Sequence, residues 1–349
     1  MNKKAILLVN LGSPDNCTEK SVSDYLNQFL MDPSVIQLPW LIRRLLVSLL
    51  VLPKRPKQSA KAYQQIWTEQ GSPLIVISQQ LKKSIQKETE HPVFMAMRYG
   101  NPSIESQLLE IAKNKDIKDV HYIPLYPHYA DSTVKTSIDE VERVIKDQQL
   151  NLNLSVKQPF YNEDSYINAL VESAFSFLFE RASAKDSSQT ERPHLLFSYH
   201  GLPESHLKSA DPTNNHCLTK ENCCATQSLA HSTCYKHQVL ETTRLFVEKS
   251  GLQSHQYSIS FQSRLGRAKW LEPSTIDTLK SLANKGIKEL VVICPAFITD
   301  CLETLEEIAI QGEEIFIQAG GRSLKLIPCL NNQPSWVNLV SQWCNEKPK

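Results

Sequence analysis

Residues 7–14 read LLVNLGSP, a short apolar run that breaks into a loop at glycine and proline. Residues 195–203 read LLFSYHGLP and repeat the same pattern in the second half of the chain. Later in each half, at residues 122–124 and 293–295, an apolar run again ends at a proline. This repetition suggests two similar halves, with a boundary near residues 160–190 and a polar linker or loop at residues 186–190.

Apolar runs of this kind recur along the chain and alternate with longer amphipathic segments, a pattern typical of parallel sheets covered by helices. We therefore predict an α/β fold made of two similar doubly wound halves. The runs that we expect to form buried strands are Ala5–Val9, Val93–Met97, Val120–Ile123, His194–Phe197, Tyr257–Phe261 and Leu290–Cys294.

Composition excludes several classes of function. Lys plus Arg (38) nearly balances Asp plus Glu (37), so no overall field would attract nucleic acid. The first apolar run stops at Asn10, too short for a signal peptide, and no stretch approaches the roughly 20 apolar residues of a membrane span. No G-x-G-x-x-G or P-loop pattern occurs. We expect a cytoplasmic protein that does not bind nucleic acid.

Polar residues that can carry chemistry follow two of the predicted strands. His200 comes directly after the strand at residues 194–198, where an imidazole can accept a proton or bind a metal. If a helix begins near Thr299, then Asp300, Glu303 and Glu307 form one acidic stripe. Taken singly, a loop histidine bonded to backbone and a solvated acidic helix face would be the better explanations of these features.

Taken together, the motifs around these residues resemble the ferrochelatase family. They run in the family's order from about residue 5 to about residue 310, which covers nearly the whole chain. The matching segments are LVNLGSP (8–14), GSP (71–73), MRYGNP (97–102), YPHY (126–129), FSYHGLP (197–203), FQSRLG (261–266), WLEP (270–273) and DCLETLEEI (300–308).

The resemblance implies that Fe²⁺ and protoporphyrin IX are the substrates and that protoheme is the product. It places His200 and Glu303 at the porphyrin centre, as proton acceptor and transient iron ligand, and leaves open which residue takes which role. Asp300 and Glu307 would be accessory carboxylates. Inserting a metal removes two protons from weakly acidic pyrrole nitrogens, so a nearby base is needed.

Further residues match the family's porphyrin pocket. Those expected to line it are Leu11, Trp270 and Phe297, and those expected to bind the two propionates are Arg55, Ser72 and Arg98.

The implied fold is chelatase-like, with a parallel four-stranded sheet flanked by helices in each half. Its expected domains are residues 1–165, with a lip of the porphyrin pocket, and residues 166–325, with His200, the cysteine insertion and the acidic helix. In residues 326–349 a C-terminal helix would pack back on the body.

The segment Trp40–Leu52 is strongly apolar and is followed by Lys54, Arg55 and Lys57. Thirteen residues cannot cross a bilayer but can lie in its surface. A core helix is an equally good interpretation on composition alone. The family places this segment at the pocket mouth, which implies peripheral contact with the inner face of the membrane.

Four cysteines, Cys217, Cys223, Cys224 and Cys234, lie within eighteen positions and have three histidines among or beside them. Four thiolates suit either a tetrahedral Zn²⁺ or a 2Fe–2S cluster, and one of the histidines could replace a cysteine as ligand. Some members of the family carry a 2Fe–2S cluster, and in certain bacterial ones its cysteines are internal. The resemblance therefore favours a non-catalytic 2Fe–2S cluster.

Two other functions remain open from the sequence. One is a related chelatase that uses coproporphyrin or another divalent metal. The other is a heme or iron–sulfur sensor without turnover, which would have no need of the paired His200 and Glu303 motifs.

Overall fold

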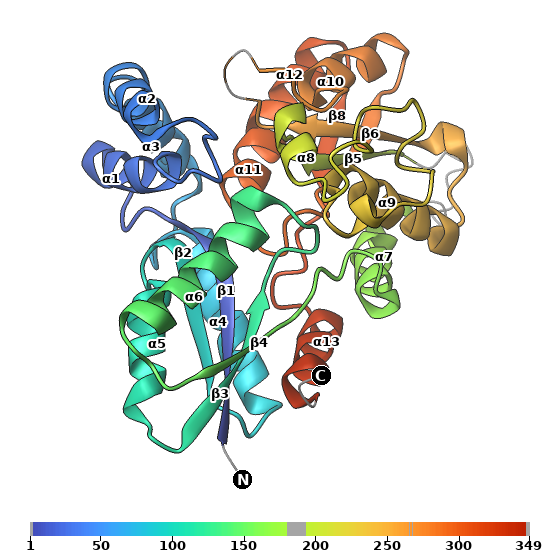
Figure 1. Ribbon diagram of the computed structural model, residues 1–349. Coiled ribbons are helices and arrows are strands. Elements are labelled where there is room, and N and C mark those ends of the chain that lie inside the picture. Colours follow the sequence, from blue (N-terminus) through green and yellow to red (C-terminus); the bar gives the residue numbers. More distant parts are fainter. Residues whose placement is uncertain (1–2, 180–192, 265, 267, 347–349) are drawn as a thin grey trace. The chain divides into compact units, whose positions relative to one another are not determined.

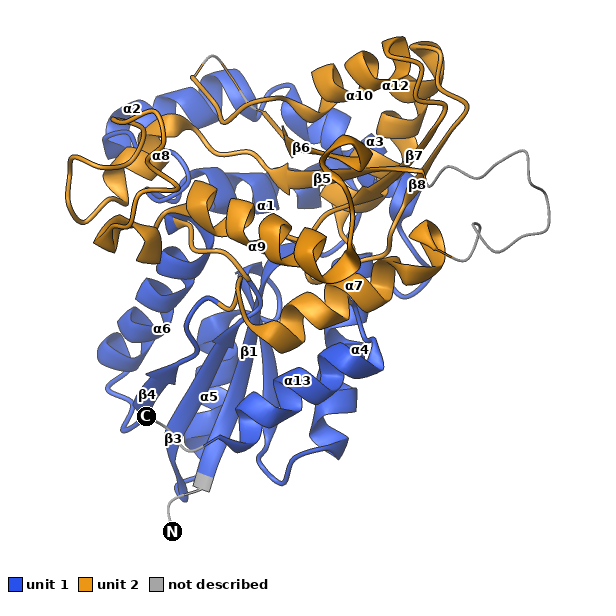
Figure 2. Cartoon of the chain, turned by 90° about the vertical axis from the view of Figure 1, so that its right-hand side faces the viewer, with its two compact units in different colours: residues 1–126, 131–159, 331–349 blue, residues 127–130, 160–330 orange. Residues whose placement is uncertain are grey.

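A computed structural model describes residues 3–179, 193–264, 266 and 268–346 of the 349-residue chain (Figure 1). The predicted linker at residues 186–190 lies outside the described residues. The chain forms two compact units (Figure 2). The first comprises residues 1–126, 131–159 and 331–349, and the second comprises residues 127–130 and 160–330.

The first unit is built on a four-stranded parallel sheet with strand order β2-β1-β3-β4. Its strands are β1 (Lys3–Ser13), β2 (Val93–Gly100), β3 (Ile117–Pro124) and β4 (Asn153–Val156). Its helices are α1 (Glu19–Leu30), α2 (Trp40–Leu45), α3 (Arg55–Ile66), α4 (Pro73–Lys87), α5 (Ile104–Lys113), α6 (Thr136–Asp147) and α13 (Pro334–Asn345), with π-helices η1 (Leu46–Val51) and η2 (Asp131–Lys135).

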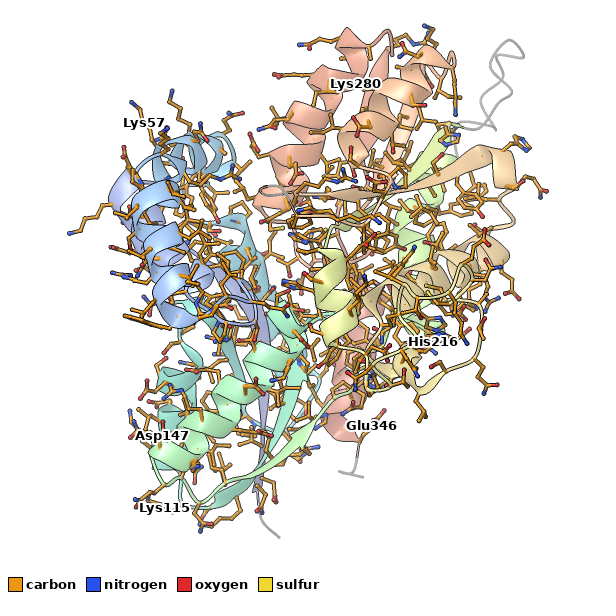
Figure 3. The ribbon with its side chains drawn as sticks, turned by 45° about the horizontal axis from the view of Figure 1, so that its top comes forward. Lys57, Lys115, Asp147, His216, Lys280 and Glu346 are labelled. Carbon is orange, nitrogen blue, oxygen red and sulfur yellow. The ribbon has the colours of Figure 1, made fainter. Side chains whose placement is uncertain are left out.

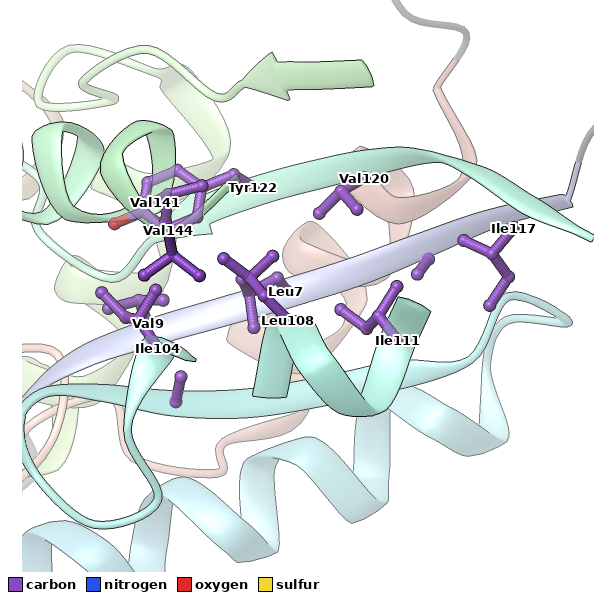
Figure 4. Close-up of a cluster of buried hydrophobic side chains, with 12 residues drawn as sticks. Leu7, Val9, Ile104, Leu108, Ile111, Ile117, Val120, Tyr122, Val141 and Val144 are labelled. Atoms are coloured by element: carbon purple, nitrogen blue, oxygen red, sulfur yellow. The ribbon is translucent and has the colours of Figure 1, made fainter. Parts of the chain in front are cut away.

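Strand β1 is the centre of this unit. Residues 5–9 are fully buried, as expected for a strand covered on both faces by helices. Leu7 pairs with Phe94 on β2 and with Tyr122 on β3. Around Leu7, side chains of α5 and α6 complete a core cluster that includes Leu108 and Val141 (Figure 4). The apolar run quoted first is therefore the core strand on which this unit packs.

The C-terminal helix α13 is attached to the start of β1 by Lys4. The Lys4 Nζ donates to the carbonyls of Cys344 at 2.7 Å and Glu346 at 2.9 Å. These carbonyls lie at the helix end, where no further turn can satisfy them. Burial lowers the pKa of Lys4, and the two carbonyls accept hydrogen bonds from its ammonium group.

The second unit repeats the architecture with strand order β6-β5-β7-β8, again all parallel. Its strands are β5 (His194–His200), β6 (Tyr257–Gln262), β7 (Glu289–Ile293) and β8 (Ser323–Leu326). Its helices are α7 (Asp164–Leu178), α8 (Glu204–Ser209), α9 (Tyr235–Ser250), α10 (Thr275–Asn284), α11 (Leu302–Leu305) and α12 (Glu313–Gln318), with 3₁₀ turns η4 (Leu229–Ser232) and η5 (Ser254–Gln256) and the π-helix η6 (Glu307–Gly312).

The predicted fold class is confirmed, because each half carries a four-stranded parallel sheet flanked by helices. The two repeated motifs lie on β1 and β5, which hold the same place in their sheets. The edge strands β4 and β8 were not predicted. They span four residues each and are only partly buried, so they lack the apolar run that marks the inner strands.

One expected helix differs from the prediction, and one segment with two open interpretations is found on the surface. The acidic helix does not begin near Thr299: α11 begins at Leu302, lasts one turn and passes into the π-helix η6. The apolar segment Trp40–Leu52 is α2 followed by the π-helix η1, and most of its large side chains are exposed rather than in a core. Among the described residues, no helix combines the length and the apolar character needed to span a bilayer.

A steric constraint at the end of β1 provides a test of the fold. Gly12 has φ +113°, and a Cβ built on it would lie 1.7 Å from the Tyr99 carbonyl oxygen of β2. Gly12→Ala should therefore reduce the free energy of unfolding by about 2–4 kcal/mol more than Gly320→Ala does. Gly320 has a similar φ of +103° with nothing within 4 Å of its Cβ position, so the pair isolates the clash. Equal losses in urea denaturation would contradict the described pairing of β1 with β2.

Candidate active site

His200 ends β5, at the carboxyl edge of the second sheet where ligands of open α/β folds bind. Its Nδ1 lies 2.6 Å from the carbonyl oxygen of Gly201. Because a carbonyl only accepts hydrogen bonds, Nδ1 must carry the proton. In the neutral ring the other nitrogen, Nε2, then keeps its lone pair and can accept a proton or bind a metal.

Gly201 is held close to the neighbouring strand β6. Its N–H donates to the Gln262 carbonyl oxygen at 2.8 Å, and a Cβ on Gly201 would lie only 2.7 Å from the same oxygen. The ring of Trp270 lies 3.4 Å from that Cβ position. Only glycine therefore allows the loop after His200 to pass between β6 and Trp270, which places Trp270 beside the histidine loop.

On the acidic segment, Glu307 is fixed by Ser263, the residue that follows β6. The Ser263 N–H donates to Glu307 Oε1 at 2.8 Å, and its Oγ–H donates to Oε2 at 2.5 Å. Ser263 adopts φ +64°, a left-handed conformation that is uncommon for a residue with a side chain. That conformation turns both donors toward the same carboxylate.

Glu307, Glu303 and His200 influence one another electrostatically. Burial raises the pKa of Glu307, and the negative charge of Glu303 raises it further. The hydrogen bonds from Ser263 and the positive form of His200 act in the opposite direction, and the net shift of the Glu307 pKa is upward. Glu307 is therefore a carboxylate that binds a proton more readily than an ordinary glutamate, beside the two residues predicted to be catalytic.

Gln262 connects the histidine loop with the acidic segment. Its Nε2 donates to the Glu303 carbonyl oxygen at 2.7 Å, and its Oε1 accepts the Ser198 hydroxyl at 2.7 Å. Its own carbonyl receives the Gly201 N–H. Gln262 is 2% exposed, so these bonds are protected from water and tie His200 and Glu303 to one strand end.

Two other predicted residues lie around this group. Phe297 has its ring centroid 6.2 Å from that of His200, so the structure brings the two together. Asp300 is buried and accepts from Thr304 Oγ at 3.1 Å and from the Cys329 N–H at 3.2 Å. Asp300 therefore ties the start of α11 to the Cys329 segment and is not an open carboxylate on a stripe with Glu303 and Glu307.

The predicted residues of the first unit lie at strand and helix ends. Leu11 is half-buried near the end of β1, and Arg55 is exposed as the first residue of α3. Ser72 is the N-cap of α4, and its hydroxyl makes no capping hydrogen bond.

Arg98 is largely committed to partners within the first unit. Its Nη2 pairs with Asp32 Oδ2 at 2.7 Å, and its Nε donates to both oxygens of Thr136. Burial alone would raise the pKa of Asp32, but hydrogen bonds from Thr136, Ser34 and Tyr99 and the charge of Arg98 hold it below its usual value. Of the guanidinium nitrogens, Nη1 is the one without a partner among the described residues.

The four clustered cysteines gather in the loop between α8 and α9. The thiols of Cys217 and Cys224 both interact with Cys234, and the Cys223 and Cys224 sulfurs are 4.0 Å apart. None of the four forms a disulfide. Over the described ranges, no group of three or more His, Cys, Asp or Glu side chains is placed to hold a metal ion.

Sequence reasoning did not assign a role to Gln262 or Ser263. Both belong to a motif quoted for the resemblance, and both directly follow the predicted strand Tyr257–Phe261, which pairs with the strand that carries His200. The carboxyl ends of adjacent parallel strands meet at one edge of a sheet. That rule could have placed both residues next to His200.

Comparisons with known proteins agree over the whole chain. A family model described as ferrochelatase matches residues 3–347. The ferrochelatase of Pseudomonas fluorescens strain Pf0-1 is 50% identical over 350 residues, covering 100% of this chain and 99% of that protein. The ferrochelatase of Stutzerimonas stutzeri strain A1501 is 49% identical over 351 residues, with the same coverage. The chain belongs to the ferrochelatase family. It is an enzyme that inserts iron into a porphyrin during heme biosynthesis.

Among solved structures, SirB from Bacillus subtilis with Fe³⁺ aligns with a TM-score of 0.55 and 13% sequence identity. The alignment covers 99% of this chain and 96% of that chain. At this identity the likeness concerns the fold alone, and it agrees with the predicted chelatase-like architecture.

The bonds between Ser263 and Glu307 predict a change in pH dependence. In Ser263→Ala the hydroxyl that lowers the pKa of Glu307 is lost, so this pKa should rise further. If ionised Glu307 is the active form, the acidic limb of the kcat/KM profile should move to higher pH. Ser281→Ala, on the exposed side of α10, should leave the profile unchanged. An acidic limb that stays in place or moves to lower pH would contradict this coupling.

Proposed function

We propose that this enzyme inserts Fe²⁺ into protoporphyrin IX, forms protoheme and releases two protons to His200 and its acidic neighbours. The observation that carries this proposal is the 2.6 Å contact between His200 Nδ1 and the Gly201 carbonyl. It leaves Nε2 as the basic nitrogen of a neutral ring at the carboxyl edge of the sheet.

The chemistry needs a base and a path for iron. Pyrrole N–H groups are weak acids, so a neutral imidazole held in place lowers the barrier to their deprotonation. Fe²⁺ must exchange its water for protein ligands, and carboxylate oxygens suit that exchange. Glu303 would receive the ion, and Glu307, with its raised pKa, would take up a released proton.

Protoporphyrin is a flat apolar disc with two carboxylates at one edge. The aromatic side chains of Trp270 and Phe297 and the apolar side chain of Leu11 would contact its faces. Arg55, Ser72 and the free Nη1 of Arg98 would bind the propionates, since guanidinium and hydroxyl groups donate to carboxylates. Asp300 would keep α11 in place rather than touch iron.

A substitution of the proposed base tests the function. His200→Ala should lower kcat for iron insertion at least about a hundredfold, as loss of a general base does. Porphyrin binding, followed by fluorescence quenching, should change little, because the pocket walls supply the affinity. Glu303→Gln should also lose most of its turnover.

His255→Ala is a matched control, since His255 is an exposed histidine of the same unit. It should retain wild-type turnover. Near-wild-type turnover of His200→Ala would overturn the proposal.

We also propose that the exposed apolar residues of α2 and η1 make peripheral contact with the inner face of the membrane. Six side chains there are more than half exposed: Trp40, Leu41, Ile42, Leu45, Leu49 and Leu50. Exposed apolar surface of this density marks an interaction site. Arg43 points inward and donates to the carbonyls of Ile36 and Leu38, so it does not interrupt the surface.

Replacing Leu45, Leu49 and Leu50 with serine should reduce co-flotation with lipid vesicles without lowering the melting temperature. The equivalent control replaces Leu109, Ile276 and Ile317, which are exposed apolar residues on other helices. If both triple variants float like the wild type, the membrane contact is wrong. If the first variant unfolds, these residues belong to a core after all.

Finally, we propose that Cys217, Cys223, Cys224 and Cys234 hold a non-catalytic 2Fe–2S cluster. Four unbonded thiols in one loop match the four thiolates that such a cluster requires. The cluster, when bound, would stabilise a loop that otherwise has little apolar core.

Anaerobically purified protein should therefore be brown and contain iron and acid-labile sulfide. Zn²⁺ has a filled d shell, so colourless protein with stoichiometric zinc would show that the cluster assignment is wrong.

A further inference from the structure

We infer that His216, His231 and His237 are positioning residues that orient the adjacent cysteines Cys223 and Cys224, through hydrogen bonds from their rings to the two cysteine carbonyls. This inference takes the four-cysteine site from the function proposed above. It gives the three histidines a role other than metal ligation.

The three rings converge on two neighbouring peptide groups. The Cys223 carbonyl oxygen lies 2.7 Å from His216 Nε2 and 3.1 Å from His231 Nε2. The Cys224 carbonyl oxygen lies 2.8 Å from His237 Nδ1. Both lone pairs of the first carbonyl and one of the second are therefore directed at imidazole rings.

These bonds determine the tautomer of each ring. Since the carbonyls can only accept, the proton must sit on Nε2 of His216 and His231 and on Nδ1 of His237. A nitrogen that carries a proton cannot coordinate a metal. The nitrogen that each ring directs at the cysteine turn is thus used for positioning and is closed to ligation.

The rings also brace one another. His231 and His237 are stacked with centroids 3.6 Å apart and planes 10° apart. His216 meets His231 edge to face at 5.5 Å, and Tyr161 meets His237 in the same way at 6.3 Å. His216, which Figure 3 labels, is buried according to its 7% exposed fraction. Packing of this kind restricts the rotamers, so the donors are held in place before any ligand binds.

Such bracing matters because Cys223 and Cys224 are consecutive. On an extended chain neighbouring side chains point to opposite sides, whereas these two sulfurs lie 4.0 Å apart. Fixing both carbonyls fixes the peptide planes on either side of Cys224, and with them the directions of the two Cβ atoms. The histidines therefore stabilise a turn that presents both thiols to one group.

Asp211 orients the backbone of a third cysteine, Cys217. Its Oδ2 accepts the N–H groups of His216 and Cys217, both at 2.8 Å. Its Oδ1 accepts the N–H and the hydroxyl of Thr213. One buried carboxylate thus links the backbone of Cys217 to that of His216, whose ring holds Cys223.

Matched-donor substitutions test the inference. The glutamine amide nitrogen replaces an imidazole Nε2–H, and the asparagine amide nitrogen replaces an Nδ1–H. His216→Gln and His237→Asn should retain the site, whereas His216→Ala, His237→Ala and the mismatched His237→Gln should weaken it. His255→Ala again serves as the control.

Two readouts separate this inference from the proposed cluster. The first is iron and sulfide per chain in purified protein, with the visible spectrum and the electron paramagnetic resonance signal of the reduced cluster. The second is Co²⁺ titration of the metal-free protein, in which thiolate-to-cobalt absorption reports the thiols directly. The alanine variants should bind Co²⁺ about tenfold or more weakly, as loss of groups that orient ligands does, and the matched donors should restore binding.

If the wild type holds no iron–sulfur cluster but the variants follow this order with Co²⁺, the cluster proposal fails and the positioning role stands. If alanine variants equal the wild type in Co²⁺ affinity and melting temperature, the positioning role is overturned. It is also overturned if His237→Gln and His237→Asn behave alike, because the effect would then not depend on the position of the donor.

Discussion

The hydrogen bond from His200 Nδ1 to the Gly201 carbonyl is the constraint on which the site depends. It assigns the proton to one ring nitrogen and leaves the other as the base. The residue that provides this carbonyl also packs closely on β6, since a Cβ on Gly201 would lie 2.7 Å from the Gln262 carbonyl oxygen. Gln262 then extends the constraint, since the same residue donates to the Glu303 carbonyl. A single strand end thereby sets the positions of the base, the aromatic wall and the acidic segment.

The positions of the acidic side chains depend on a second feature, the change from an α-helical turn to a π-helix at Glu307. A regular α-helix from Thr299 would place Asp300, Glu303 and Glu307 on one face. In the structure Asp300 precedes the helix and accepts hydrogen bonds from Thr304 and from the Cys329 N–H. Glu307 instead accepts hydrogen bonds from Ser263. Such π-helical insertions occur frequently at functional sites, where they redirect a side chain at the cost of regular hydrogen bonding. The outcome is a pair of carboxylates with different surroundings rather than an equivalent stripe.

The features that the sequence predicts correctly are those marked by a local pattern of apolar and turn-forming residues. The inner strands β1 and β5 are marked in the sequence by apolar runs that break at glycine and proline, and His200 is predicted as a functional residue from its place at a strand end. Sequence patterns do not predict features that depend on contacts between residues far apart in the chain. The edge strands β4 and β8 carry little apolar signal, and the partner of Arg98, Asp32, lies 66 positions away in the chain. The hydrogen bonds from the histidine rings to the carbonyls of Cys223 and Cys224 could not be predicted either, because residue spacing does not determine which carbonyl an imidazole donates to.

The central claim is that His200 presents Nε2 as the unprotonated nitrogen of a neutral ring. Nitrogen-15 NMR of protein labelled in its histidine rings measures this directly, with His200→Gln used to assign the signals. In the neutral ring, at a pH high enough that the ring signals no longer move, a protonated Nδ1 and an unprotonated Nε2 are expected for His200. The reverse tautomer, with the proton on Nε2, would contradict the account, because that nitrogen could then neither accept a pyrrole proton nor bind iron.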